Sequence, residues 1–106
     1  MREPVQPSDC RYTLSMLVAR RFRLTGRVQG VGFRFFAESA AQREGVTGWI
    51  ENRPDGSVEV LAEGESESLS RFEAKLRRGP AGARVERVDV FEDVPAGRTG
   101  EFTIRR

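Results

Sequence analysis

The sequence predicts a two-layer α+β sandwich built in the order strand, helix, strand, strand, helix, strand. Three observations support this fold. Runs of alternating apolar and polar residues recur along the chain, two stretches carry apolar residues at helical spacing, and each of these stretches lies between two alternating runs. Right-handed crossovers would place both helices on one face of a mainly antiparallel sheet. A chain of 106 residues is long enough for one such core and too short for two.

The N-terminal residues show no periodic apolar pattern and contain Pro4 and Pro7. We therefore predict a poorly ordered extension over residues 1–16 and a single domain over residues 17–106. Met16 stands directly before the first strand-like run, so residues 1–15 either precede the true translation start or form a short arm that packs on the domain.

The first strand and the first helix follow directly from their patterns. Leu17 to Val28 alternates, and it predicts a half-buried strand with apolar residues on one face and arginines on the other. Phe33 to Glu44 predicts a helix that ends at Gly45, a favourable C-cap. Its predicted buried stripe consists of Phe33, Phe36, Ala37, Ala40 and Ala41. Phe35 falls outside this stripe, where it would border a site at the start of the helix.

The next two strands form a predicted hairpin. They span Val46 to Glu51 and Ser57 to Glu63, joined by a turn at residues 53–56 that contains Pro and Gly. Asn52 therefore stands at the end of a strand, beside the turn. The sequence leaves open whether Arg53, which follows it, contacts a substrate or points to solvent.

The last part of the chain completes the pattern. A helix is predicted from Ser66, a plausible N-cap after a break at residues 64–67, to about Arg78. Residues 85–94 then predict a fourth strand with Val88 and Val90 facing inward, and residues 102–104 predict a short final strand.

A glycine-rich loop joins the first strand to the first helix over residues 28–34. Gly30 and Gly32 lie two positions apart, and a loop of this kind before a helix can direct backbone N–H groups at an anion. Arg34 falls in the first helical turn, where its guanidinium fork suits a phosphate. The residue types predict a phosphate or carboxylate site, with a plain strand–turn–helix connection as the alternative.

Two motifs resemble the acylphosphatase family: Gly26-Arg27-Val28-Gln29-Gly30-Val31-Gly32-Phe33-Arg34 and, farther on, Gly48-Trp49-Ile50-Glu51-Asn52. The resemblance runs from about residue 17 to the C-terminus. It implies a ferredoxin-like α/β sandwich that hydrolyses acyl phosphates without a metal or other cofactor. It further implies that Arg34 binds phosphate and that Asn52 orients the attacking water. The phosphate-binding loop would comprise Gln29, Gly30, Val31, Gly32 and Phe33.

The composition excludes several other chemistries. The chain contains no histidine, so a Ser-His-Asp triad and His-ligated zinc are excluded. The only cysteine, Cys10, lies outside the stretch that resembles the family, and the loop has Val28 where thiol-dependent phosphatases carry their nucleophile. The loop also lacks the Gly-Lys-Ser/Thr ending of a nucleotide-binding P-loop.

Charge and hydropathy suggest few macromolecular partners. The formal charge is only +2 with both signs interspersed, which favours neither a nucleic-acid nor a membrane partner. No apolar run approaches the length of a membrane span or a secretory signal. We expect a cytoplasmic monomer that takes a small-molecule acyl phosphate and releases inorganic phosphate.

Two other function classes share this pattern. RNA-binding domains use the same element order, but they present aromatic residues on their first and third strands, and residues 57–63 contain none. A non-catalytic binding or regulatory domain is the second alternative, because the N-terminal domain of a hydrogenase-maturation carbamoyltransferase also resembles the loop motif. That domain is part of a much larger chain, so the length of this one favours the enzyme.

Overall fold

A computed structural model describes residues 16–97 and 100–105. Within these residues, seven elements follow one another: β1 (Leu17–Arg27), α2 (Phe33–Glu44), β2 (Thr47–Asn52), β3 (Val58–Glu65), α3 (Ser66–Arg78), β4 (Arg84–Asp93) and β5 (Thr103–Arg105). The five strands form one sheet in the order β4-β1-β3-β2-β5, in which only β2 and β5 run parallel. This topology confirms the predicted sandwich. The predicted N-terminal extension lies almost wholly outside the described residues.

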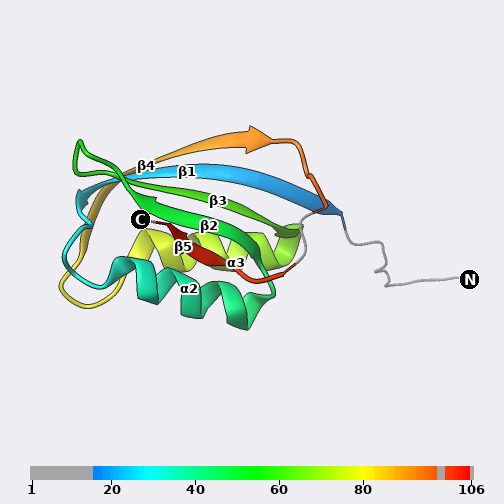
Figure 1. Cartoon of the computed structure of the whole chain (residues 1–106), viewed down its shortest axis with the longest axis horizontal. Coiled ribbons are helices and arrows are strands. Elements are labelled where there is room, and N and C mark those ends of the chain that lie inside the picture. Colours follow the sequence, from blue (N-terminus) through cyan, green and yellow to red (C-terminus); the bar gives the residue numbers. More distant parts are fainter. Residues whose placement is uncertain (1–15, 98–99, 106) are drawn as a thin grey trace, which may run out of the picture.

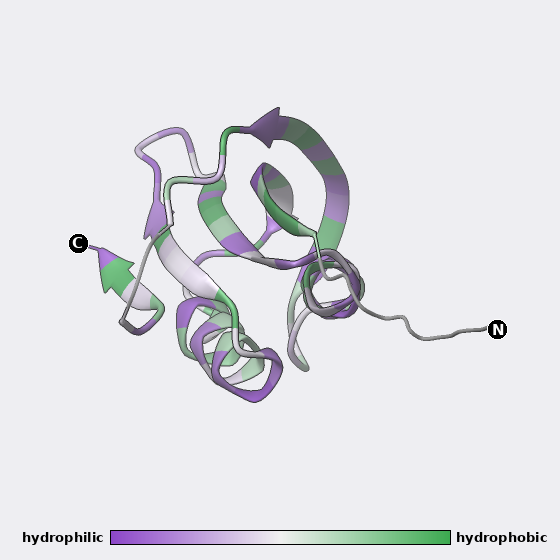
Figure 2. Ribbon diagram, turned by 90° about the vertical axis from the view of Figure 1, so that its right-hand side faces the viewer, coloured by the Kyte–Doolittle hydropathy of each residue, from purple (hydrophilic) through white to green (hydrophobic). Residues whose placement is uncertain are grey.

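Both helices cover the same face of the sheet (Figure 1). Figure 2 views the two helices nearly end-on and shows the sheet curving over them. An ion-pair cluster joins the helices, because Glu44 of α2 accepts hydrogen bonds from Arg71 at 2.8 Å and from Lys75 at 3.2 Å on α3. The hydrogen bond from Arg71 is the main cause of the lowered pKa of Glu44.

The core lies between the sheet and the helices. Its sheet side comes from every second residue of the central strands, as the alternation predicts: Phe22, Leu24, Ile50, Val58, Val60 and Ala62 are almost completely buried. On the helix side, Phe72 of α3 meets Phe102 edge-to-face, with ring centroids 5.6 Å apart. This contact holds α3 against the segment that leads into β5.

The start of α3 differs from the prediction. Ser66 is the first helical residue and not the cap, because β3 continues to Glu65, which occupies the N-cap position without a side-chain hydrogen bond. The N–H of Ser66 donates instead to the carbonyl of Met16 at 3.0 Å. The ladder with β1 carries β3 through Gly64, which pairs with Val18. Strand pairing therefore outweighed the local signal for a break.

The fourth strand also differs in part. Val88 is partly buried as predicted, but Val90 is 37% exposed although it was predicted to face inward. Val90 pairs with Phe22 on the helix-covered side, yet β4 is an edge strand with a neighbour on one side only. An edge position leaves part of an inward-facing side chain in solvent.

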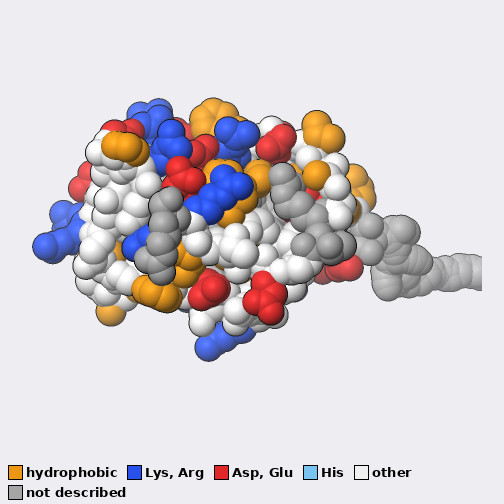
Figure 3. Space-filling view, in the orientation of Figure 1, with side chains coloured by type: hydrophobic (Ala, Val, Ile, Leu, Met, Phe, Trp, Pro, Cys, Tyr) orange, Lys and Arg blue, Asp and Glu red, His pale blue; other side chains and the backbone are white. Residues whose placement is uncertain are grey.

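The open face of the sheet carries charges of both signs. The guanidinium of Arg105 lies 4.2 Å from the ring centre of Trp49, and most of the other arginines on this face pair with carboxylates. Figure 3 shows basic and acidic side chains interspersed over the strands. Trp49 therefore packs on the open face, away from the loop between β1 and α2.

Candidate active site

The loop between β1 and α2 depends on two glycines in the left-handed region. Gly30 has φ 74° and Gly32 has φ 76°. An added Cβ at either position would meet no atom within 4 Å, so the backbone conformation, and not a close neighbour, requires glycine here. The buried side chain of Val28 anchors the start of the loop in the core.

The loop presents free backbone donors. Gly32 is the N-cap of α2 and offers no side-chain cap, and the first helical hydrogen bond runs from the N–H of Phe36 to the carbonyl of Gly32 at 3.1 Å. Within the described part of the chain, no acceptor takes the N–H groups of residues 30–35. Free N–H groups at the positive end of a helix dipole attract an anion.

A cavity of about 100 Å³ opens beside these donors. It is lined by Val28, Gly30, Gly32, Phe33, Arg34, Phe35 and Asn52. Its lining comes from the loop after β1, the start of α2 and the end of β2, and these segments lie on the left of Figure 1. Its volume exceeds that of a single water molecule and leaves space for an anion of phosphate size.

Arg34 lines this cavity and has no carboxylate partner among the described residues. Among the arginines that the structure describes, most pair with a carboxylate, whereas Arg34 makes no ion pair and no side-chain hydrogen bond, although it is partly buried. A partly buried guanidinium with its donors free is suited to bind an anion from solution.

Asn52 supplies the second polar side chain. It is the last residue of β2, and its Oδ1 atom is buried without a hydrogen-bond partner. A buried, unsatisfied acceptor is costly unless a water or ligand completes it. The geometry therefore leaves one acceptor available beside the cavity that Arg34 and the loop share.

Gln29 and Val31 do not line the cavity. The Nε2 atom of Gln29 donates to the carbonyls of Arg53 at 2.8 Å and Ser57 at 2.9 Å, so it ties the loop to the β2–β3 turn. Val31 packs against the core. These two residues support the loop, whereas Gly30, Gly32 and Phe33 form its cavity wall.

Arg53 points to the opposite face of the sheet from Asn52. Its guanidinium lies 2.8 Å from Glu51 and 3.4 Å from Glu59. Successive strand residues face opposite sides, and Glu51 pairs with Glu59 on the face opposite Asn52, so this ion-paired arginine lies away from the cavity. Arg53 therefore forms ion pairs on the open face of the sheet and does not line the cavity.

The β2–β3 turn is itself fixed by Asp55. Its Oδ1 accepts from the N–H of Ser57 at 2.9 Å and from the Ser57 hydroxyl at 2.6 Å, and its other oxygen pairs with Arg23. The Ser57 hydrogen bonds, followed by the charge of Arg23, lower the pKa of Asp55. The resulting stabilisation is therefore present above the ordinary carboxyl pKa and is lost as the pH falls through the folded-state value.

The model of the acylphosphatase family matches residues 20–104. The chain belongs to the acylphosphatase family. A curated acylphosphatase of Koribacter versatilis is 47% identical over 80% of this chain and 77% of its own length, and one of Thermus thermophilus is 52% identical over 71% and 85%.

Solved structures agree with this family assignment. The crystal structure of acylphosphatase from Bacillus subtilis superposes with a TM-score of 0.81 at 37% identity, over 86% of this chain and all of that one. Full-length HypF in a phosphate- and nucleotide-bound form gives a TM-score of 0.79 at 27% identity over 91% of this chain, but over only 13% of its own. The acylphosphatase match spans a whole chain, whereas the HypF match is confined to a small part of that protein.

In this acylphosphatase-family chain, Arg34 and Asn52 lie at one cavity, as the sequence predicts for one site. Val28 and Phe35 also line it, although neither was counted among the site residues. Phe35 borders the cavity as its position in the sequence predicts, because it follows Arg34 and falls outside the buried stripe of α2. No pattern in the sequence predicts the two hydrogen bonds of Gln29, since glutamine residues are found mostly on exposed surfaces.

We expect Gln29→Met to lower kcat/KM at least about tenfold, because both tethering hydrogen bonds are lost and the loop can shift relative to Asn52. Steady-state kinetics with benzoyl phosphate measures this effect. The matched control is Gln42→Met, at an exposed position of α2, which should keep the activity of the wild type. Unchanged kinetics in Gln29→Met would show that the tether has no role in positioning.

Proposed function

We propose that this chain hydrolyses acyl phosphates to a carboxylate and inorganic phosphate by in-line attack of water. In this proposal, the 28–34 loop and Arg34 hold the phosphoryl group, and Asn52 positions the water. Membership of the acylphosphatase family supplies the reaction class. The observation that supports the residue roles is that Arg34, Asn52 and the glycine loop line one shared cavity.

The phosphoryl group would bind at the start of α2. Its oxygens would accept hydrogen bonds from the free N–H groups of the loop, and the Arg34 guanidinium would offset the charge that remains. These donors are fixed by the backbone before the substrate arrives, so little reorganisation is needed as charge shifts in the transition state.

The attacking water would be held by Asn52. The free Oδ1 atom can accept a hydrogen bond from this water, which leaves an oxygen lone pair to attack phosphorus. As the new P–O bond forms, the bond between phosphorus and the acyl oxygen breaks, and the acyl oxygen keeps the electron pair as a carboxylate. A phosphate oxygen of the substrate takes the proton of the water. No protein base is then required.

The leaving group explains why so few residues suffice. A carboxylate is a weak base and leaves with little or no help from a general acid. Unactivated phosphate monoesters require far greater acceleration, which this residue set does not offer. Hydrolysis of benzoyl phosphate and acetyl phosphate, with p-nitrophenyl phosphate as a control substrate, tests the proposal. Absence of turnover on both acyl phosphates would favour a non-catalytic binding domain.

We expect a chelator and a thiol-alkylating reagent to leave the rate unchanged. Within the described residues, no group of three or more His, Cys, Asp or Glu side chains could hold a metal ion. The sequence has no histidine, and its single cysteine, Cys10, lies outside the loop and outside both motifs. Initial rates after incubation with EDTA or iodoacetamide provide the measurement. Loss of activity in EDTA that a divalent cation restores would contradict the mechanism.

The proposed substrate is a small molecule, and the open face of the sheet supports this choice over RNA. On that face, β1 and β3 present charged and aliphatic residues, and many of the charges are already paired: Arg21, Arg23 and Glu59 all form ion pairs. Base stacking would require aromatic residues on those strands. Within the described part of the chain, no helix is long and apolar enough to span a membrane. A cytoplasmic location and a monomeric state stay predictions from the sequence.

A further inference from the structure

Phe35 is an exposed aromatic residue at the mouth of the cavity. Its side chain is 63% exposed, whereas Phe22, Phe33, Phe72 and Phe102 are almost completely buried. A single exposed apolar residue needs no explanation by itself. Phe35, however, follows Arg34 directly in the first turn of α2 and lines the same cavity. Its ring is therefore available to whatever extends from a bound phosphoryl group.

The rest of the cavity wall contains no spare charge. Arg34 and Asn52 are its only polar side chains among the described residues, and the proposed mechanism uses both for the phosphoryl group and the water. The remaining wall is glycine backbone, Val28 and the two phenylalanines. An anionic group on the acyl chain would find no cation there other than Arg34, which the phosphoryl group already occupies.

We propose that the Phe35 ring forms the wall of an acyl subsite and that the enzyme favours acyl phosphates with an apolar, above all aromatic, acyl group. This inference rests on the proposed function. Contact between the ring and an aromatic acyl group removes apolar surface of both from water and adds ring stacking. The same contact persists from bound substrate to transition state, so it acts on KM more than on kcat.

The test compares Phe35→Ala with the wild type on two substrates. For benzoyl phosphate, kcat/KM should fall about three- to tenfold, the range expected for loss of one aromatic contact. For acetyl phosphate, which is too short to cover the ring, the change should stay within about twofold. Phe35→Tyr keeps the ring face and should keep the wild-type ratio of the two substrates.

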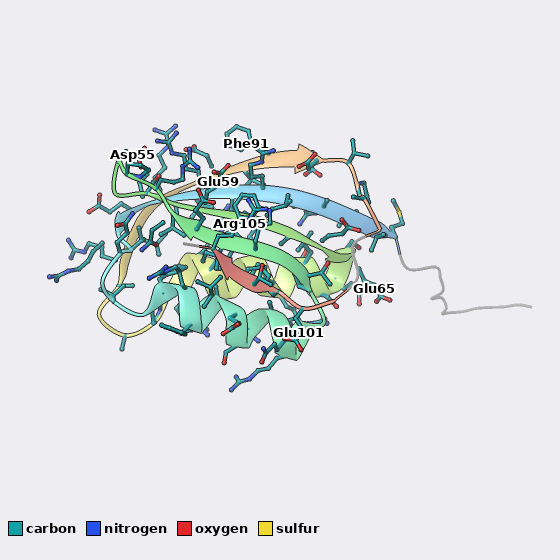
Figure 4. The ribbon with its side chains drawn as sticks, in the orientation of Figure 1. Asp55, Glu59, Glu65, Phe91, Glu101 and Arg105 are labelled. Atoms are coloured by element: carbon teal, nitrogen blue, oxygen red, sulfur yellow. The ribbon has the colours of Figure 1, made fainter. Side chains whose placement is uncertain are left out.

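Phe91→Ala is the matched control, because Phe91 is 54% exposed on β4. Figure 4 shows it above the sheet, and it is not among the residues that line the cavity. Its substitution should change kcat/KM for neither substrate.

A second experiment tests the expected discrimination against charged acyl groups. The wild type should hydrolyse butyryl phosphate with a higher kcat/KM than succinyl phosphate, which differs by a terminal carboxylate.

Each other result overturns the inference. An unchanged benzoyl-to-acetyl ratio in Phe35→Ala would remove Phe35 from the acyl subsite while leaving the proposed function intact. An equal loss on both substrates with weaker inhibition by inorganic phosphate would show that Phe35 supports the loop instead. If the wild type hydrolyses neither substrate, the proposed function itself fails, which separates the two conclusions.

Discussion

Replacement of Arg34 by alanine is expected to lower kcat/KM at least a hundredfold. This factor corresponds to a loss of about 3 kcal/mol or more of transition-state stabilisation. Arg34 lies in the first turn of α2 and lines the cavity, and no carboxylate in the described part of the chain neutralises it. Without it, the phosphoryl charge faces only backbone N–H groups. Steady-state kinetics on benzoyl phosphate measures the loss of activity, and competitive inhibition by inorganic phosphate measures the loss of phosphate affinity. We expect both losses in the same variant.

Arg34→Lys tests the geometry of this contact. A lysine restores the charge but not the planar fork of donors, so it should recover little of the activity. Arg43→Ala provides the matched control, since Arg43 is an exposed arginine of the same helix, in its last turn. It should behave like the wild type. Wild-type affinity for inorganic phosphate in Arg34→Ala would refute the role of Arg34.

Elements whose periodicity is strong were predictable from the sequence. The residue limits of α2 agree with the prediction at both ends, because Gly32 and Gly45 bound it and both adopt positive φ. The alternation of β1 placed Phe22 and Leu24 in the core correctly. In these segments the local pattern and the tertiary packing favour the same structure.

The errors arose where partners distant in sequence decide the structure. Gly64 and Ser66 carry the local signature of a strand end and a helix cap, but pairing with β1 extends β3 through Gly64 to Glu65, and Ser66 becomes the first residue of α3. The burial of Glu63 is likewise not predictable from the sequence. It is a carboxylate on the open face, yet it is buried because its oxygens accept the N–H groups of Ala96 at 3.0 Å and Gly97 at 2.8 Å.

Of the candidate site, the sequence predicts the cavity-lining residues Arg34 and Asn52 but not the contacts that support them. The two motifs identify Arg34 and Asn52, and the β-α-β-β order brings them to one end of the sheet. The tether from Gln29 and the unsatisfied Oδ1 of Asn52 depend on how the loop packs against the hairpin turn. No local pattern encodes such contacts, so only the folded structure places them.

Asn52→Ala is expected to lower kcat by about a hundredfold or more while KM and inhibition by phosphate change little. The reason is that Asn52 would hold the water, whereas Arg34 and the loop hold the phosphoryl group. Loss of the side chain then affects the reaction step and not substrate binding. It also removes a buried acceptor that lacks a partner, so the substitution should not destabilise the fold through that atom.

Asn52→Asp distinguishes this role from simple occupancy of space. A carboxylate has nearly the same shape, but its charge would repel the phosphoryl group and it lacks the amide donor, so it should not restore kcat. Thr47→Ala, at the opposite end of β2, serves as the control for strand integrity and should keep its activity. Circular dichroism must show each variant folded. If folded Asn52→Ala keeps a near-normal kcat, or raises KM alone, then another group positions the water, because loss of its holder must slow the chemical step.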